Sequence, residues 1–115
     1  MASHEVVVVL CTVPEAGAAR LVDAVLELRL AACVQSVGPV RSRYRWQGGV
    51  EESTETLLVL KTARDRVEAL RAALVAHHPY QVPEVLELPV SGGHEAYLQW
   101  VFAETRLPGA TGETA

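Results

Sequence analysis

Two extended segments on either side of Gln47-Gly48-Gly49 constrain the fold of this chain more than any other feature. The glycine pair is a turn signal, so the strand-like segments 31–46 and 50–62 predict a β-hairpin. Each arm of about a dozen residues would extend roughly 40 Å at ~3.3 Å per residue, beyond the usual strand of about five or six residues. The excess must bend or pair with another chain, because a long bare edge invites association.

The order of apolar patterns along the chain predicts an α+β domain. Val6 to Cys11 is a continuous, mostly β-branched run, which is typical of a central strand covered on both faces. The expected elements are strands over 6–11, 31–46, 50–62 and 85–90, main helices over 15–30 and from about 65 to 77, and a short helix from 94 to about 105. This β-α-β-β-α-β order with an extra C-terminal helix is the ferredoxin-like split plan, an antiparallel sheet with both main helices on one face. Right-handed crossovers then give the sheet order 4-1-3-2.

Three local signals predict where elements begin or bend. Thr12 can cap a first helix whose first turn holds Pro14. Thr62 and Asp65 stand three residues apart, as in a capping box, and predict the start of the second main helix. The pair Gly38-Pro39 interrupts the second strand and predicts a bend or bulge there.

Length and charge set the broad class of protein. The 115 residues correspond to one domain, and their net charge of −4 disfavours a nucleic-acid partner. The apolar run over 6–10 is far shorter than the ~20 residues that span a bilayer, so no membrane segment is expected. We expect one folded domain over 1–105 and a disordered tail over 106–115, which is rich in Pro, Gly and Thr.

Cys11 and Cys33 both lie in apolar runs, on strands that are not adjacent in the predicted sheet. This placement argues against a disulfide, and free cysteines are typical of a reducing compartment, so we expect a cytoplasmic protein. Cys11 could act as a nucleophile beside the first helix, but a buried thiol is the favoured interpretation. The chain has neither a Gly-x-Ser-x-Gly motif nor a Walker-type phosphate loop, and we expect no enzyme activity.

Alternating arginines share one face of the first hairpin arm, and aromatic side chains share the other. The arginines are Arg41, Arg43 and Arg45, and the aromatic residues are Tyr44 and Trp46. A basic stripe beside aromatic residues can bind RNA. Three glutamates stand on the second arm: Glu51, Glu52 and Glu55. Ion pairs between the two arms, or between subunits, are therefore the favoured interpretation.

The segment His77-His78-Pro79-Tyr80-Gln81-Val82-Pro83-Glu84 is the least ordinary stretch of the sequence. Its two prolines exclude a continuous helix, so we expect a stiff corner between the second main helix and the last strand. Two adjacent imidazoles stand at its entrance, and imidazole is the commonest metal ligand in proteins. The simpler alternative is that both histidines only end a helix, where a partly cationic side chain suits the helix dipole.

A thiolate with imidazoles suits copper or zinc, which prefer soft ligands. The predicted fold allows Cys11 and the two histidines to lie at the same end of the sheet but does not fix their positions. The spacing carries no Cys-x-x-Cys or His-x-x-x-His clamp, so residue patterns alone give a weak indication of a metal site.

Several motifs taken together resemble the CutA family of divalent-cation tolerance proteins. In chain order they are Val9-Leu10-Cys11-Thr12-Val13-Pro14, Leu30-Ala31-Ala32-Cys33-Val34, Tyr44-Arg45-Trp46-Gln47-Gly48, Leu60-Lys61-Thr62, the corner from His77 to Glu84, and Tyr97-Leu98-Gln99-Trp100. They cover nearly everything from residue 6 to about 105. Each motif is weak alone, and the set in this order is highly specific.

The resemblance implies a ferredoxin-like homotrimer whose long hairpins pair between subunits, in a cytoplasmic protein associated with copper and divalent-cation tolerance. It also implies that copper is the bound ion, with Cys11, His77 and His78 as the metal ligands. Gln47 and Gln81 stand where many family members carry acidic residues. These two differences remove carboxylates from a hard-cation site and leave the thiolate and imidazole ligands in place.

A second interpretation belongs to a different class of function. The same trimeric architecture resembles the PII signalling proteins, which take nucleotides or small effectors in clefts between subunits. On this alternative, clefts lined by residues such as Tyr44, Trp46 and Tyr80 would bind a small effector or a partner protein.

Overall fold

The computed structural model describes residues 5–107, and its elements follow the order predicted from the sequence. The strands are β1 (Val6–Val13), β2 (Cys33–Trp46), β3 (Gly49–Ala63) and β4 (Val85–Pro89). The helices are α1 (Glu15–Glu27), α2 (Val67–His77) and α3 (Glu95–Glu104), with a short 3-10 helix over Arg64–Arg66 leading into α2.

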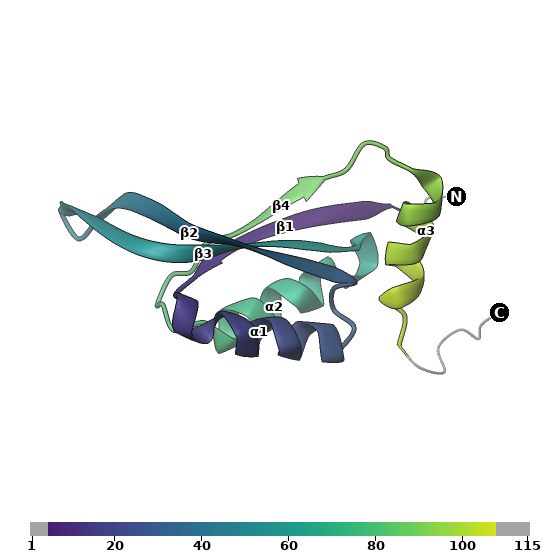
Figure 1. The fold of residues 1–115 in the computed structure, drawn as a ribbon, viewed down its shortest axis with the longest axis horizontal. Coiled ribbons are helices and arrows are strands. Elements are labelled where there is room, and N and C mark those ends of the chain that lie inside the picture. Colours follow the sequence, from purple (N-terminus) through teal and green to yellow (C-terminus); the bar gives the residue numbers. More distant parts are fainter. Residues whose placement is uncertain (1–4, 108–115) are drawn as a thin grey trace.

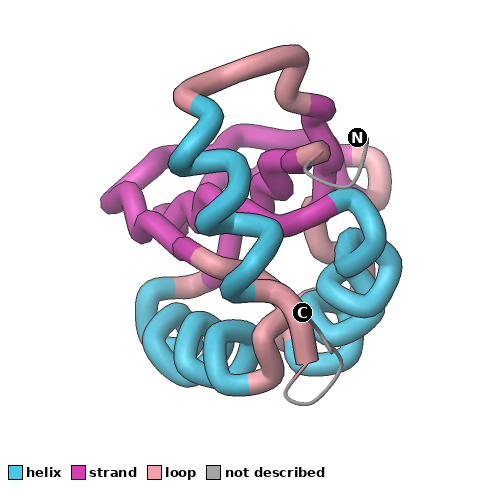
Figure 2. Tube along the Cα trace, turned by 90° about the vertical axis from the view of Figure 1, so that its right-hand side faces the viewer, coloured by secondary structure: helices cyan, strands magenta, loops and turns pink. Residues whose placement is uncertain are grey.

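The four strands form one antiparallel sheet in the order β2-β3-β1-β4, which confirms the predicted order. Helices α1 and α2 lie on the same face of this sheet (Figure 1). Seen from the end of the molecule that carries α3, that helix stands in front of the sheet, and the two main helices lie side by side below it (Figure 2). The arrangement is the split βαβ plan expected from the sequence.

The core lies between the sheet and the two main helices. It is built from β1 (Val7, Val9, Cys11, Val13), α1 (Ala18, Leu21, Val25), β3 (Leu58, Leu60) and α2 (Val67, Leu70, Leu74), with Leu30 and Ala31 beside them. In β1 the inward residues alternate with outward ones, because successive side chains of a strand point to opposite faces. The outward residues Val8 and Leu10 are only half-buried, so this chain covers one face of its central strand and not both.

The β2–β3 hairpin projects beyond the helices and gives the molecule its length of 53 Å (Figure 1). Arg41 forms an ion pair of 2.8 Å with Glu52 across the arms, and Arg43 lies 3.7 Å from the same carboxylate, which confirms cross-strand pairing on this face. The pairing register skips from Val37 to Val40, so the bulge predicted at Gly38-Pro39 is also confirmed.

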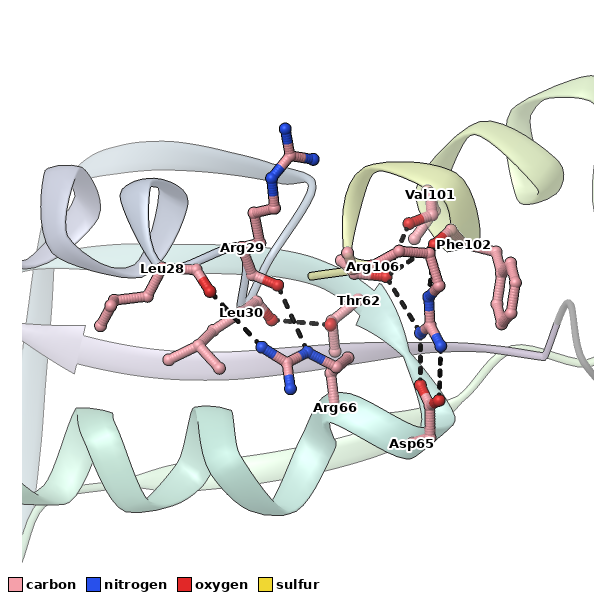
Figure 3. A network of polar contacts seen from close by, with 10 residues as sticks. Leu28, Arg29, Leu30, Thr62, Asp65, Arg66, Val101, Phe102 and Arg106 are labelled. Atoms are coloured by element: carbon pink, nitrogen blue, oxygen red, sulfur yellow. Dashed lines mark hydrogen bonds and ion pairs between the residues drawn. The ribbon is translucent and has the colours of Figure 1, made fainter. Parts of the chain in front are cut away.

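Both predicted helix caps are wrong. Thr12 belongs to β1, and the residue before α1 is Pro14, without a side-chain cap. Thr62 lies inside β3, where its hydroxyl donates to the carbonyl oxygen of Leu30 at 2.7 Å (Figure 3). A tertiary partner has taken the hydroxyl of Thr62, and strand pairing holds Thr12 in β1. Helix α1 also ends earlier than predicted, and Arg29 adopts a φ of +58° just after it.

The end of α3 is fixed to the rest of the domain by Arg106 (Figure 3). Its guanidinium donates to both carboxylate oxygens of Asp65, at 2.6 and 2.5 Å, and lies 3.9 Å from the centre of the Phe102 ring. The ion pair, with its hydrogen bonds, lowers the pKa of Asp65. The remainder of the tail that the sequence predicts to be disordered, 108–115, lies outside the described residues.

Between residues 5 and 107, no helix is long and apolar enough to cross a membrane.

The buried bond between Thr62 and the Leu30 carbonyl provides a first test of this packing. We expect Thr62→Val to lower the free energy of unfolding by about 1–3 kcal/mol, because it leaves a buried acceptor without its donor. Urea denaturation at one fixed protein concentration measures the change. Thr54→Val, at an exposed position of the same strand, is the matched control and should change stability by less than about 0.5 kcal/mol. Equal effects of the two substitutions would contradict this account.

Candidate functional site

Cys11 lies within β1, not at its end as the sequence suggested. The strand continues for two further residues, since Thr12 and Val13 pair with Leu57 and Thr56 of β3. Cys11 itself pairs with Leu58 on one side and with Val85, the first residue of β4, on the other. Its side chain is fully buried in the core. The thiol therefore sits where the central strand meets the start of the last strand.

His78 follows α2 and turns its ring toward β1. Nε2 lies 2.7 Å from the carbonyl oxygen of Thr12, and Nδ1 accepts a hydrogen bond of 3.1 Å from the backbone N–H of Tyr80. A carbonyl only accepts and an amide N–H only donates, so these partners assign a neutral ring with its proton on Nε2. Both ring nitrogens are thus committed to hydrogen bonds within the chain.

The structure brings Cys11 and His78 together at one atom. The carbonyl oxygen of Thr12 accepts the His78 bond, and the Cys11 sulfur lies 3.8 Å from the same oxygen. A thiol from the core and an imidazole from the end of α2 therefore share one acceptor on β1.

His77 takes a different direction. It is exposed on the last turn of α2, and its Nδ1 lies 2.9 Å from the carbonyl oxygen of Ala73. This contact requires a proton on Nδ1, because a carbonyl oxygen only accepts. The two adjacent histidines therefore point in different directions: His78 points into the domain, and His77 bonds back to its own helix.

Tyr80 and Glu55 form a second attachment that the sequence did not indicate. The Tyr80 hydroxyl donates to one carboxylate oxygen of Glu55 at 2.7 Å, and Ser42 donates to the other at 2.5 Å. Glu55 is only 4% exposed. The centroids of the Tyr80 and His78 rings lie 4.8 Å apart. Residues 25 apart along the chain meet here, and no local pattern marks such a contact.

The surroundings of Cys11 keep its thiol protonated. Burial is the main cause, and the nearby carboxylates of Glu84 and Glu55 add to it, so that the pKa of Cys11 rises to about 11. Burial and the bond to Glu55 also raise the pKa of Tyr80, to about 12. At neutral pH the site holds a thiol and not the thiolate that binds soft metals.

The three predicted ligands are not gathered around one point in this arrangement. Both nitrogens of His78 are hydrogen-bonded, the Cys11 thiol is buried and protonated, and His77 is directed elsewhere. Over the described part of the chain, no group of three or more His, Cys, Asp or Glu side chains is placed to hold a metal. Ligation by the predicted set would require the 78–84 corner to move.

The sequence matches a known protein family and its members over most of its length. A family profile described as CutA1 divalent ion tolerance protein matches residues 7–104. The divalent-cation tolerance protein CutA of Pectobacterium atrosepticum is 45% identical over 103 residues, which cover 89% of this chain and 94% of that protein.

Solved structures agree with the sequence match. CutA1 from Oryza sativa is 38% identical, with a TM-score of 0.87 over 92% of this chain and 98% of that one. A structure described as the periplasmic divalent cation tolerance protein CutA from Archaeoglobus fulgidus is 28% identical, with a TM-score of 0.84 over 88% of this chain and 99% of that one. These matches do not favour the interpretation as a small-effector signalling module.

The raised pKa of Cys11 makes a prediction about stability in alkali. The folded thiol ionises near pH 11 and the unfolded one near its ordinary 9.0, so the folded state binds more protons between these values. The stabilisation is therefore fully present below pH 9 and is lost as the pH rises toward 11. In a Cys33→Ser background, urea denaturation at several pH values should show a steeper fall in this window than the matched Cys11→Ala variant shows. Parallel curves would contradict the assignment.

Proposed function

The chain belongs to the CutA1 divalent ion tolerance protein family, and from this premise we propose that it is a copper-binding homotrimer that acts in divalent-cation tolerance without catalytic turnover. The family assignment supplies the cellular role. The main observation that supports assembly is the apolar sheet face that this chain leaves uncovered.

This open face lies opposite α1 and α2 (Figure 1). Strand alternation and register assign to it Val8, Leu10, Val37, Leu57, Val59, Leu86 and Leu88. Leu86 is 53% exposed and Leu88 is 45% exposed, and the outward residues of β1 and β3 are only half-buried. Soluble monomers rarely expose so continuous an apolar patch, and such patches mark interaction sites. A second and a third copy of the chain would cover it.

The hairpin provides a second reason for assembly. β2 is an edge strand of 14 residues, and its outer half projects beyond the helices (Figure 1). An edge of this length carries a row of unpaired backbone N–H and C=O groups that can hydrogen-bond to another strand. Pairing with the hairpin of a neighbouring subunit would satisfy them, and a closed ring of subunits leaves no hairpin unpaired.

Copper is the proposed ion because the candidate donors are soft. Cys11, His77 and His78 offer a thiolate and imidazole nitrogens, a set that suits copper better than hard cations. Two of the three, Cys11 and His78, already lie beside the same carbonyl oxygen. The proton of Cys11 and the hydrogen bonds of His78 must be given up before the two groups can ligate, so binding is expected to be coupled to a change in the 78–84 corner.

We propose a reducing compartment, the cytoplasm, as the site of action. Both cysteines are free thiols, on strands separated by β3. This usage is typical of proteins that meet glutathione and thioredoxin.

A single substitution that introduces a charge tests assembly through the open face. We expect the unmodified protein to sediment as a trimer, and Leu86→Lys to sediment as a smaller species, because lysine would have to be buried without a partner. Leu28→Lys is the matched control, since Leu28 is equally exposed at the end of α1, away from the open face. Analytical ultracentrifugation over a range of concentrations measures both. A monomeric unmodified protein, or equal effects of the two substitutions, would contradict the proposal.

Copper binding can be measured by calorimetric titration with Cu(II), and with Cu(I) under anaerobic conditions. We expect about one ion per subunit, with affinity reduced at least tenfold in Cys11→Ser and in the His77→Ala/His78→Ala double variant. His94→Ala, at an exposed histidine before α3, serves as the control and should bind like the unmodified protein. Unchanged affinity in Cys11→Ser would remove Cys11 from the ligand set.

A further inference from the structure

We propose that residues 78–84 form a latched cover over the Cys11 thiol, and that opening of this cover gives a soft ion or thiol reagent access to the site. The inference rests on the proposed copper role for its biological meaning. The cover itself is argued from contacts within the chain and can be tested without metal.

Both ends of the cover flank Cys11. At one end, His78 is bonded to the carbonyl oxygen of Thr12, the next residue along β1. At the other end, Val85 pairs directly with Cys11 across the sheet. Glu84, just before it, lies near enough to contribute to the raised pKa of the thiol. The intervening residues therefore span the segment of β1 that holds the thiol.

Side-chain bonds hold the cover closed at two latches. The first is His78, which joins the Thr12 carbonyl on β1 to the backbone N–H of Tyr80. The second is the Tyr80 hydroxyl, which donates to the buried carboxylate of Glu55 on β3. The His78 and Tyr80 rings, whose centroids lie 4.8 Å apart and whose planes are tilted by 51°, connect the latches. Loss of either latch should weaken the other, because bonds that share a network are coupled.

Between the latches the segment is weakly held. Pro79, Gln81, Val82 and Glu84 are exposed, and Val82 is 67% exposed. Among the described residues, no backbone–backbone hydrogen bond holds 79–84. Segments with few buried contacts and few backbone bonds open locally at a small fraction of the global free energy of unfolding. The cover can therefore open while the core remains folded.

The predicted ligand atoms are occupied in the closed structure, and opening of the cover makes them available. In the closed state both His78 nitrogens are occupied and the thiol is buried, so neither group is available. Release of the first latch breaks the bond from the Tyr80 N–H, which frees the lone pair of His78 Nδ1, and moves the imidazole away from the carbonyl oxygen beside the thiol. Access to the site is then set by the equilibrium between closed and open cover.

The rate at which a thiol reagent modifies Cys11 measures this equilibrium. In a Cys33→Ser background without metal, we expect Tyr80→Phe to raise the rate of reaction with dithiobis(nitrobenzoate) by about tenfold or more, because it removes one hydrogen bond to a buried carboxylate. Tyr44→Phe is the matched control. Its hydroxyl makes a 3.3 Å contact with Ser53 on the exposed hairpin, and its loss should leave the rate unchanged.

Low concentrations of urea separate local opening from global unfolding. Opening of the cover exposes little surface, so the labelling rate should depend weakly on urea below the unfolding transition. An unchanged rate in Tyr80→Phe, or a rate that rises steeply from zero urea in parallel with global unfolding, would overturn the cover.

The outcomes also distinguish this inference from the proposed function. Labelling that depends on Tyr80, with no copper binding in the calorimeter, supports the cover and removes the copper role. Copper binding together with labelling that is independent of Tyr80 supports the copper role and overturns the cover.

Discussion

The central strand β1 is the element on which the rest of this structure depends. It pairs with β3 along its whole length and with β4 over five residues, and its inward side chains form the floor on which α1 and α2 pack. The same strand supplies the Thr12 carbonyl that holds His78, and so fixes the end of α2 and the corner after it. A shift of β1 by one residue would turn its core side chains to the opposite face.

This arrangement uses candidate metal ligands as parts of the fold. Cys11 fills a core position, and His78 ties the corner to β1 through both of its ring nitrogens. Buried polar groups require partners, so a histidine at this depth bonds to whatever the chain offers when no ion is bound. The fold and the proposed metal function therefore compete for the same atoms, and a weakly held cover lets one chain serve both.

Features set by local patterns could be predicted from the sequence, and features set by distant contacts could not. The apolar run of β1, the glycine turn of the hairpin and the bulge at Gly38-Pro39 each follow from a few neighbouring residues. The helix caps predicted at Thr12 and Thr62 are wrong, because strand pairing holds Thr12 and a tertiary partner takes the Thr62 hydroxyl. The Tyr80 bond to Glu55 joins segments far apart along the chain, and a single sequence carries no signal for it.

The central claim is that the corner opens independently of the strand to which it is latched. Native-state hydrogen exchange of the unmodified protein, followed residue by residue, tests it most directly. The account predicts that the amide of Tyr80, which bonds to His78, exchanges through a local opening at least about tenfold faster than the amides of β1, which require global unfolding. Equal protection at Tyr80 and in β1 would show that the corner opens only when the whole domain unfolds, and would contradict the account.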